Sequence, residues 1–262
     1  MQRTFFLAYG IACYGLFLAT FAYLLAFVGN LFLPRSIDQG PSSGVLVAAI
    51  VDVALILLFG LQHSLMARAW FKAWWTQWIP QPIERSTYLL ASSLVTAVLV
   101  GFWQPIDIIL WDVTQPALRY CLWGLFFAGW LLVPAVSLMI NHFDLFGLRQ
   151  VWLHWQGKEL APLAFRTPLL YARVRHPLYV GWAIAFWATP TMTVGHALFA
   201  ALMTSYMLIA VIYEERDLLA HFGQQYREYQ KAVPMFLPRW RTTESPTRTK
   251  ETEVAAGHYS SK

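Results

Sequence analysis

The chain has 262 residues, of which 58% are apolar and 16% aromatic, and only 13% are charged. This charged fraction is about half that of an ordinary soluble domain, and the mean hydropathy is +0.46. The composition is not that of a soluble domain and predicts an all-α, polytopic membrane protein, because helices satisfy their own backbone hydrogen bonds in lipid. The soluble nucleotide-binding enzyme folds are excluded, because the chain has neither alternating strands nor a GxGxxG motif.

Six weakly charged segments follow one another along the chain. The first four are long enough to cross about 30 Å of hydrocarbon as helices, and the last two only just reach that length. The segments are Phe5–Leu33, Val45–Ala67, Thr87–Trp103, Tyr120–Ile140, Leu178–Thr193 and Gly195–Tyr213. The first is too long for the core of a signal peptide, so we interpret it as a retained span. The last two predict a helical hairpin.

These spans divide the chain into three parts. Residues 1–140 are expected to form a four-helix membrane core. Residues 141–238 are expected to hold an inner loop, the hairpin and an amphipathic cytoplasmic helix, which we expect Gly223 to kink and Pro234 to end. Residues 239–262 are polar and have few apolar side chains to bury, which predicts a disordered cytoplasmic tail.

The basic residues indicate how the spans are oriented. Six spans place both ends of the chain on one side. If that side is the cytoplasm, the outer loops hold only Arg35 and Arg119, and the other 17 of the 19 basic residues are inside. This asymmetry favours cytoplasmic termini. The net charge of +5 thus reflects membrane orientation, lipid is the expected partner, and no basic stripe indicates nucleic acid. The oligomeric state is left open.

Two short polar passages bracket the predicted hairpin, at Arg175–Gly181 and at Glu214–Asp217. Because a hairpin returns to the side that it left, both passages are expected to meet at one water–lipid boundary. The first turn of a helix that begins at Pro177, together with the guanidinium of Arg175, suits a ligand carboxylate. The carboxylates of Glu214 and Glu215 suit an ammonium or a sulfonium. S-adenosylmethionine carries all of these groups.

Metal-ligand and phosphate-binding motifs are missing from the sequence. Cys13 and Cys121 are far apart, without the spacing of a zinc site, so no metal is expected. The chain has no glycine-rich phosphate loop and no GxSxG motif. A cofactor is therefore expected to be held by helices and the loops between them.

The two polar passages follow a known pattern. The order R-H-P-x-Y-x-G at Arg175–Gly181 is followed by E-E-x-x-L-x-x-x-F-G-x-x-Y-x-x-Y-x-x-x-V-P at 214–234. Over about 165–238 the chain thereby resembles the isoprenylcysteine carboxyl methyltransferase and phospholipid methyltransferase superfamily of integral-membrane enzymes. The resemblance implies a cytoplasmic pocket for S-adenosylmethionine. The residues that it implies for this pocket are Arg175, His176, Pro177, Tyr179, Gly181, Glu214, Glu215, Tyr226 and Tyr229.

Two further segments bear on the methyl acceptor. Gln62–Arg68 and Asn141–Gly147 resemble the branch that includes the NnrU-like proteins and the bacterial methanethiol S-methyltransferases. This implies a small thiol substrate in a bacterial inner membrane, with methanethiol converted to dimethyl sulfide and S-adenosylhomocysteine as the second product. Because a thiol ionises poorly at neutral pH, a proton acceptor is needed. The candidates are His63, His142 and Tyr171, with Asn141 as an orienting amide.

Other functions remain open at this point. A methyltransferase for a prenylcysteine carboxylate or a phospholipid amine would need a lateral opening for a lipid chain. A small-thiol enzyme would instead have a small cavity lined by aromatic side chains. A third possibility is a non-catalytic or isomerase-like relative of NnrU, associated with haem through His63.

Overall fold

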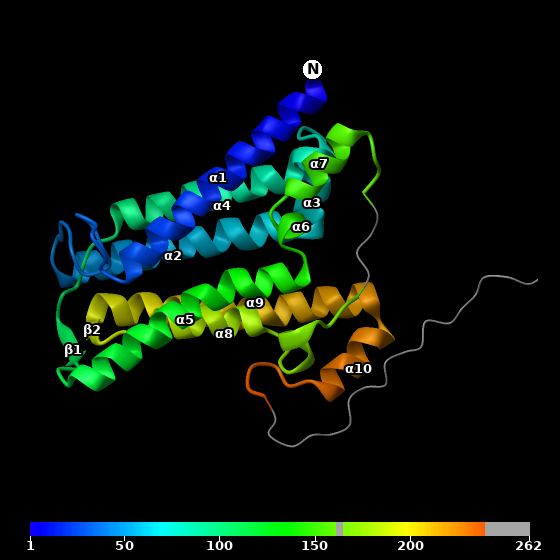
Figure 1. Ribbon diagram of the computed structural model, residues 1–262. Helices are drawn as coiled ribbons and strands as arrows, with labels where there is room; N and C mark the ends of the chain where they lie inside the picture. Colours follow the sequence, from blue (N-terminus) through cyan, green and yellow to red (C-terminus); the bar gives the residue numbers. More distant parts are fainter. Residues whose placement is uncertain (161–164, 239–262) are drawn as a thin grey trace, which may run out of the picture.

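The computed structural model describes residues 1–160 and 165–238, and these are predominantly helical (Figure 1). Five helices are long and apolar enough to cross a membrane: α1 (Gln2–Val28), α2 (Val45–Ala67), α4 (Gln81–Phe102), α5 (Pro116–Ile140) and α9 (Val194–Phe222). The all-α, polytopic class predicted from the sequence is therefore confirmed. The predicted disordered tail, 239–262, lies outside the described residues.

The remaining elements are short and connect the long helices. They are α3 (Ala69–Trp75), β1 (Ile109–Asp112), α6 (His142–Leu145), α7 (Leu148–Gln156), the 3-10 helix η1 (Leu169–Ala172), α8 (Pro177–Trp187), β2 (Thr191–Thr193) and α10 (Gln224–Ala232). Figure 1 shows α3, α6, α7 and α10 at one end of the bundle and the β1–β2 pair at the other.

The long helices form two groups that share one apolar core. In the first group, helices α1 and α2 pack against α4. In the second group, α5 and α9 pack against α8, and α2 contacts α9 between the two groups. The largest fully buried side chains of this shared core are Phe27, Phe126, Trp130, Phe186 and Phe199. Many other large apolar side chains point outward, as expected of a protein whose solvent is hydrocarbon.

The fifth predicted span differs from a full-length helix. Helix α8 begins at Pro177, as expected, but ends at Trp187 after 11 residues. Pro190 has no backbone N–H and disfavours helical backbone at the residue before it, which explains why the helix is not continued. The chain completes its path to the far end through β2, which pairs antiparallel with β1.

The sixth span is longer than predicted. Helix α9 continues past Tyr213 to Phe222, so Glu214 and Glu215 lie on the spanning helix itself rather than on a separate cytoplasmic element. The helix ends at Gly223, whose φ of +57° lies in the left-handed region that favours glycine. The short helix α10 then folds back and ends at Ala232, two residues before Pro234. The polar end of α9 is thereby brought to the start of α8.

Two glycines let α5 and α8 approach closely. A Cβ added at Gly129 of α5 would lie 2.6 Å from the backbone nitrogen of Ala185 and 2.9 Å from the carbonyl oxygen of Gly181. Both of these atoms belong to α8, so the backbones themselves are in contact, in the manner of small-residue packing between membrane helices.

We expect Gly129→Ala to destabilise the protein by about 1–3 kcal/mol, because the added methyl group has no flexible side chain to displace. Gly124→Ala on the same helix is the matched control, since a Cβ there meets no atom within 4 Å. The measurement is thermal unfolding in detergent. Equal stabilities of the two variants would contradict the close packing of α5 and α8.

Candidate functional site

A cavity of about 610 Å³ lies at the end of the bundle that carries α6, α7 and α10. Its volume is in the range of sites for small molecules and cofactors. Five parts of the chain form its wall: the end of α5, α7, the loop before α8, α8 itself with the residues preceding it, and the end of α9 with α10. The lining residues are Ile140, Asn141, Arg149, Phe165, Arg166, Tyr171, Arg175, His176, Leu178, Tyr179, Glu214, Leu218, Phe222, Tyr226 and Tyr229.

The segment that precedes α8 is fastened to the segment that follows α10. The backbone N–H of Arg175 donates to the carbonyl of Pro234 at 2.9 Å, and that of His176 donates to the carbonyl of Met235 at 3.1 Å. These bonds satisfy donors near the start of a helix, where no partner exists within the helix. Residues 175 and 235 therefore lie side by side although 60 residues separate them.

Glu215 is the residue that links the members of this arrangement. Its Oε1 accepts from Nε of Arg175 at 2.7 Å and contacts Nε2 of His176 at 3.0 Å. Its Oε2 accepts from Nε2 of Gln230 at 3.0 Å. The Arg175 and Glu215 side chains are only 10% and 13% exposed. The Glu215 carboxylate is thus engaged by three protein side chains and does not line the cavity.

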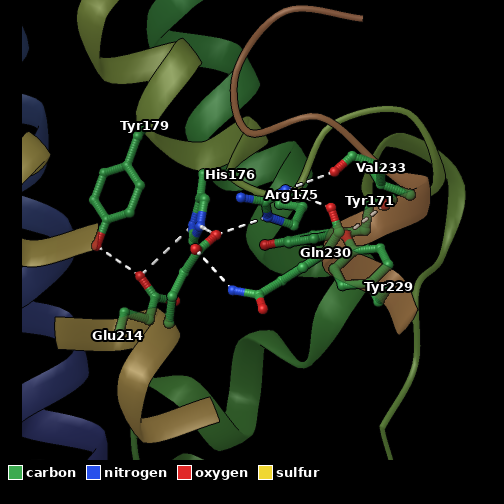
Figure 2. Close-up of polar contacts among 9 residues, drawn as sticks. Tyr171, Arg175, His176, Tyr179, Glu214, Tyr229, Gln230 and Val233 are labelled. Carbon is green, nitrogen blue, oxygen red and sulfur yellow. Dashed lines mark hydrogen bonds and ion pairs between the residues drawn. The ribbon is translucent and has the colours of Figure 1, made fainter. Parts of the chain in front are cut away.

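The guanidinium of Arg175 is similarly engaged. Besides its ion pair with Glu215, its Nη1 donates to the carbonyls of Gln230 at 3.1 Å and Val233 at 2.7 Å (Figure 2). Arg175 therefore holds together three segments of the chain. The charge that it brings to the wall of the cavity is neutralised by the carboxylate of Glu215.

The neighbouring residue Glu214 is placed differently. Its side chain is 46% exposed and lines the cavity. Its Oε2 accepts a hydrogen bond from the hydroxyl of Tyr179 at 2.9 Å and lies 3.8 Å from Nδ1 of His176 (Figure 2). Glu214 therefore presents a carboxylate that a ligand cation can approach.

Aromatic side chains form another part of the wall. The ring of Phe165 lies 5.1 Å from that of Phe222, 6.0 Å from Tyr226 and 5.5 Å from Tyr229, measured between centroids. The hydroxyl of Tyr229 donates to the carbonyl of Tyr171 at 2.5 Å. This cluster offers flat apolar faces to a ligand ring and joins α10 to the loop before α8.

Burial raises the pKa of the Tyr171 hydroxyl, and the nearby Glu214 carboxylate raises it further. Burial likewise raises the pKa of Tyr226 and Tyr229. A phenol whose pKa is raised stays protonated at neutral pH. These tyrosines can therefore donate hydrogen bonds in the cavity but are poor proton acceptors.

The structure brings most of the residues expected at the site to one cavity. Those that line it are Asn141, Tyr171, Arg175, His176, Tyr179, Glu214, Tyr226 and Tyr229. Those that lie outside its lining are His63, His142, Pro177, Gly181 and Glu215. Pro177 begins α8, and Gly181 faces α5, where a Cβ would lie 3.3 Å from the carbonyl of Gly129.

The two histidines expected to move a proton are held elsewhere. His142 contacts the hydroxyls of Tyr14 at 2.6 Å and Ser137 at 2.8 Å, so each of its ring nitrogens has a partner. Burial lowers the pKa of His142. His63 belongs to a separate cluster between α2, α4 and α9, where its Nδ1 contacts the hydroxyl of Ser92 at 3.3 Å and its ring stacks on Phe59.

Sequence reasoning did not single out several lining residues. The helical periodicity and the motif include Leu218 and Phe222, but they predict only an apolar helix face. In the structure both residues line the cavity. Arg149, Arg166 and Phe165 belong to no motif. The signal available for the two arginines was their position in the predicted inner loop, close to the polar passages.

Comparison with known proteins identifies close relatives over almost the whole chain. The chain is 49% identical over 238 residues to "Methanethiol S-methyltransferase" of Crocosphaera subtropica, covering 91% of this chain and 93% of that protein. It is 48% identical over 238 residues to the protein of the same name in Mycobacterium tuberculosis, covering 91% and 98%.

A more distant relative is "Nurim" of Bos taurus, 31% identical over 183 residues, with 66% of this chain and 69% of that protein covered. No family profile matches the chain, and no solved structure matches it. The resemblance inferred from the sequence motifs is confirmed by these relatives.

We expect Glu215→Ala to lower the free energy of unfolding by about 3 kcal/mol, because Arg175 would stay partly buried without its anion. The measurements are thermal unfolding in detergent and limited proteolysis in the segment that follows Gly223. Glu228→Ala is the matched control, since Glu228 is exposed on α10 and its carboxylate contacts Gln224 alone among the described residues. Identical behaviour of the two variants would argue against the central role of Glu215.

Proposed function

Because the chain belongs to the family of methanethiol S-methyltransferases, we propose that it methylates methanethiol to dimethyl sulfide in the cavity described above, with S-adenosylmethionine as the methyl donor. The similarity to enzymes of this name extends over nine-tenths of the chain. The observation that carries the assignment to this cavity is the available carboxylate of Glu214 beside an aromatic wall, both contributed by the motif region.

The residues present fit S-adenosylmethionine. The carboxylate of Glu214 can pair with a ligand ammonium or sulfonium, and its bond to Tyr179 fixes its position. Phe165, Phe222 and Tyr226 offer flat faces for an adenine ring. The volume of about 610 Å³ leaves room for a small acceptor beside the cofactor.

The reaction needs positioning more than covalent help from the protein. The cofactor supplies an activated methyl group bound to a sulfonium. In the overall reaction the thiol loses its proton, its sulfur forms a bond to the methyl carbon, and the bond from that carbon to the sulfonium sulfur breaks. The products are dimethyl sulfide, S-adenosylhomocysteine and a proton. The contribution of the chain is to align the thiol, exclude water and stabilise the thiolate.

We assign contact with the thiol to Asn141 and Tyr171, which line the cavity. The protonated Tyr171 hydroxyl and the Asn141 amide can donate to a thiolate, which favours the ionised thiol. The lining groups able to take the proton are the carboxylate of Glu214 and Nδ1 of His176. His63 and His142 are expected to position the helices that surround the cavity rather than to meet the thiol.

We place the cavity on the cytoplasmic side of a bacterial inner membrane. The β1–β2 end of the bundle carries Arg35 and Arg119, whereas the other 12 basic residues of the described chain lie toward the cavity end. This distribution follows the positive-inside rule. A cytoplasmic cavity has direct access to the pool of S-adenosylmethionine.

Cells that express the chain and receive methanethiol are expected to release dimethyl sulfide, measured by gas chromatography of the headspace. Glu214→Gln should lower the rate at limiting cofactor about 10-fold or more, because a charged contact to the ligand is lost. Glu228→Gln is the control, since its exposed carboxylate is not in the cavity. No dimethyl sulfide from wild-type protein confirmed in the membrane would reject the proposed function.

Tyr171→Phe is expected to lower the turnover number about 10-fold, with little change in cofactor affinity, because it removes a hydroxyl facing the thiol but keeps the backbone carbonyl that binds Tyr229. The measurements are steady-state kinetics and calorimetric titration with S-adenosylmethionine. Tyr120→Phe, at the exposed start of α5, is the control. An unchanged turnover number for Tyr171→Phe would remove this residue from the mechanism.

A further inference from the structure

Arg149 and Arg166 are cationic side chains in the wall of the cavity that the sequence motifs do not include. We propose that these two arginines bind the carboxylate of S-adenosylmethionine and thereby make the site selective for a donor that carries one. The inference rests on the proposed function and assigns the anion-binding part of the same site.

Arg175, the arginine of the motif, is poorly placed for this task. Its Nε and Nη1 already make three hydrogen bonds. Its Nε lies 2.7 Å from Oε1 of Glu215, and both side chains are nearly buried. To bind a ligand carboxylate, the guanidinium of Arg175 would have to break its ion pair with Glu215 or bind two carboxylates at once. The Arg175–Glu215 pair therefore supplies little net positive charge to the ligand.

Arg149 has a fixed backbone and spare hydrogen-bond donors. It is the second residue of α7. The residue before this helix is Gly147, whose φ of +84° and close approach to Ser86 define how the helix begins. Its Nη1 donates to Oδ1 of Asp144 at 3.1 Å, and the side chain is 29% exposed. Asp144 offsets the charge of Arg149, but a guanidinium has five N–H donors, so this one ion pair leaves other donors to bind a ligand carboxylate.

Arg166 brings a second cation from a different segment. Its side chain is exposed and, among the described residues, forms no ion pair. The adjacent Phe165 packs against Phe222 and Tyr229, which holds the backbone at the cavity. Arg166 is thus a cation at the cavity whose charge no side chain of residues 1–160 or 165–238 neutralises through an ion pair.

The lining of the cavity offers charges of both signs. Glu214 offers a carboxylate on α9, whereas Arg149 and Arg166 offer guanidinium groups on α7 and in the loop before α8. A zwitterionic amino acid end needs both signs within one site. Charge-assisted hydrogen bonds to arginine are the strongest way to hold a carboxylate, because the guanidinium can bind both of its oxygens.

The test compares S-adenosylmethionine with decarboxylated S-adenosylmethionine, by calorimetric titration of the full chain purified in neutral detergent. Wild-type protein should bind the carboxylated ligand about 10-fold or more tightly than the decarboxylated one. Arg166→Gln and Arg149→Gln should each weaken binding of S-adenosylmethionine and reduce this preference. Neither should weaken binding of the decarboxylated ligand.

Arg173→Gln is the matched control, because Arg173 is exposed in the same segment but does not line the cavity. It should keep the wild-type preference. If the arginine variants bind both ligands as wild-type protein does, the carboxylate assignment is overturned while the proposed function stands. If wild-type protein binds neither ligand, the proposed function itself fails. A variant that binds decarboxylated S-adenosylmethionine with the wild-type affinity is also shown to be folded.

Discussion

The ion pair between Arg175 and Glu215 is the interaction on which the candidate site depends. It joins the residues before α8 to the end of α9 at a distance of 2.7 Å. Through its further bonds to Gln230 and Val233 it also fixes α10 and the segment that follows. Three parts of the chain that surround the cavity are therefore held by one nearly buried pair. Such a pair is costly to break on one side, because an unpaired charge would stay buried.

Two adjacent glutamates have different tasks as a result. Successive residues of an α-helix point about 100° apart around its axis, so Glu214 and Glu215 cannot face the same surroundings. Glu215 is directed at Arg175, His176 and Gln230 and stabilises the fold. Glu214 is directed at Tyr179 and the cavity and is available to a ligand. The E-E motif thus combines one carboxylate that stabilises the fold with one that stays available to a ligand.

The membrane core supports this end of the bundle by close packing rather than by polar contacts. Gly129 and Gly181 allow the backbones of α5 and α8 to touch. Helix α8 begins at Pro177, next to the backbone bonds that tie Arg175 and His176 to Pro234 and Met235. Under the proposed function, a small apolar thiol and a charged cofactor meet in this cavity, where electrostatic stabilisation is stronger than in bulk water.

The sequence by itself determined the membrane class, the hairpin that brings two polar passages together, and the residues of the methyltransferase motif. These follow from hydropathy, from chain reversal and from motif spacing, all of which are local properties. It did not determine that the Glu215 carboxylate is paired with Arg175, or that His63 and His142 are not among the residues that line the cavity. Nor did it indicate Arg149 and Arg166. Only the tertiary structure decided these points, because the cavity is formed by segments that are distant in sequence, and spacing along the chain does not specify which side chains meet.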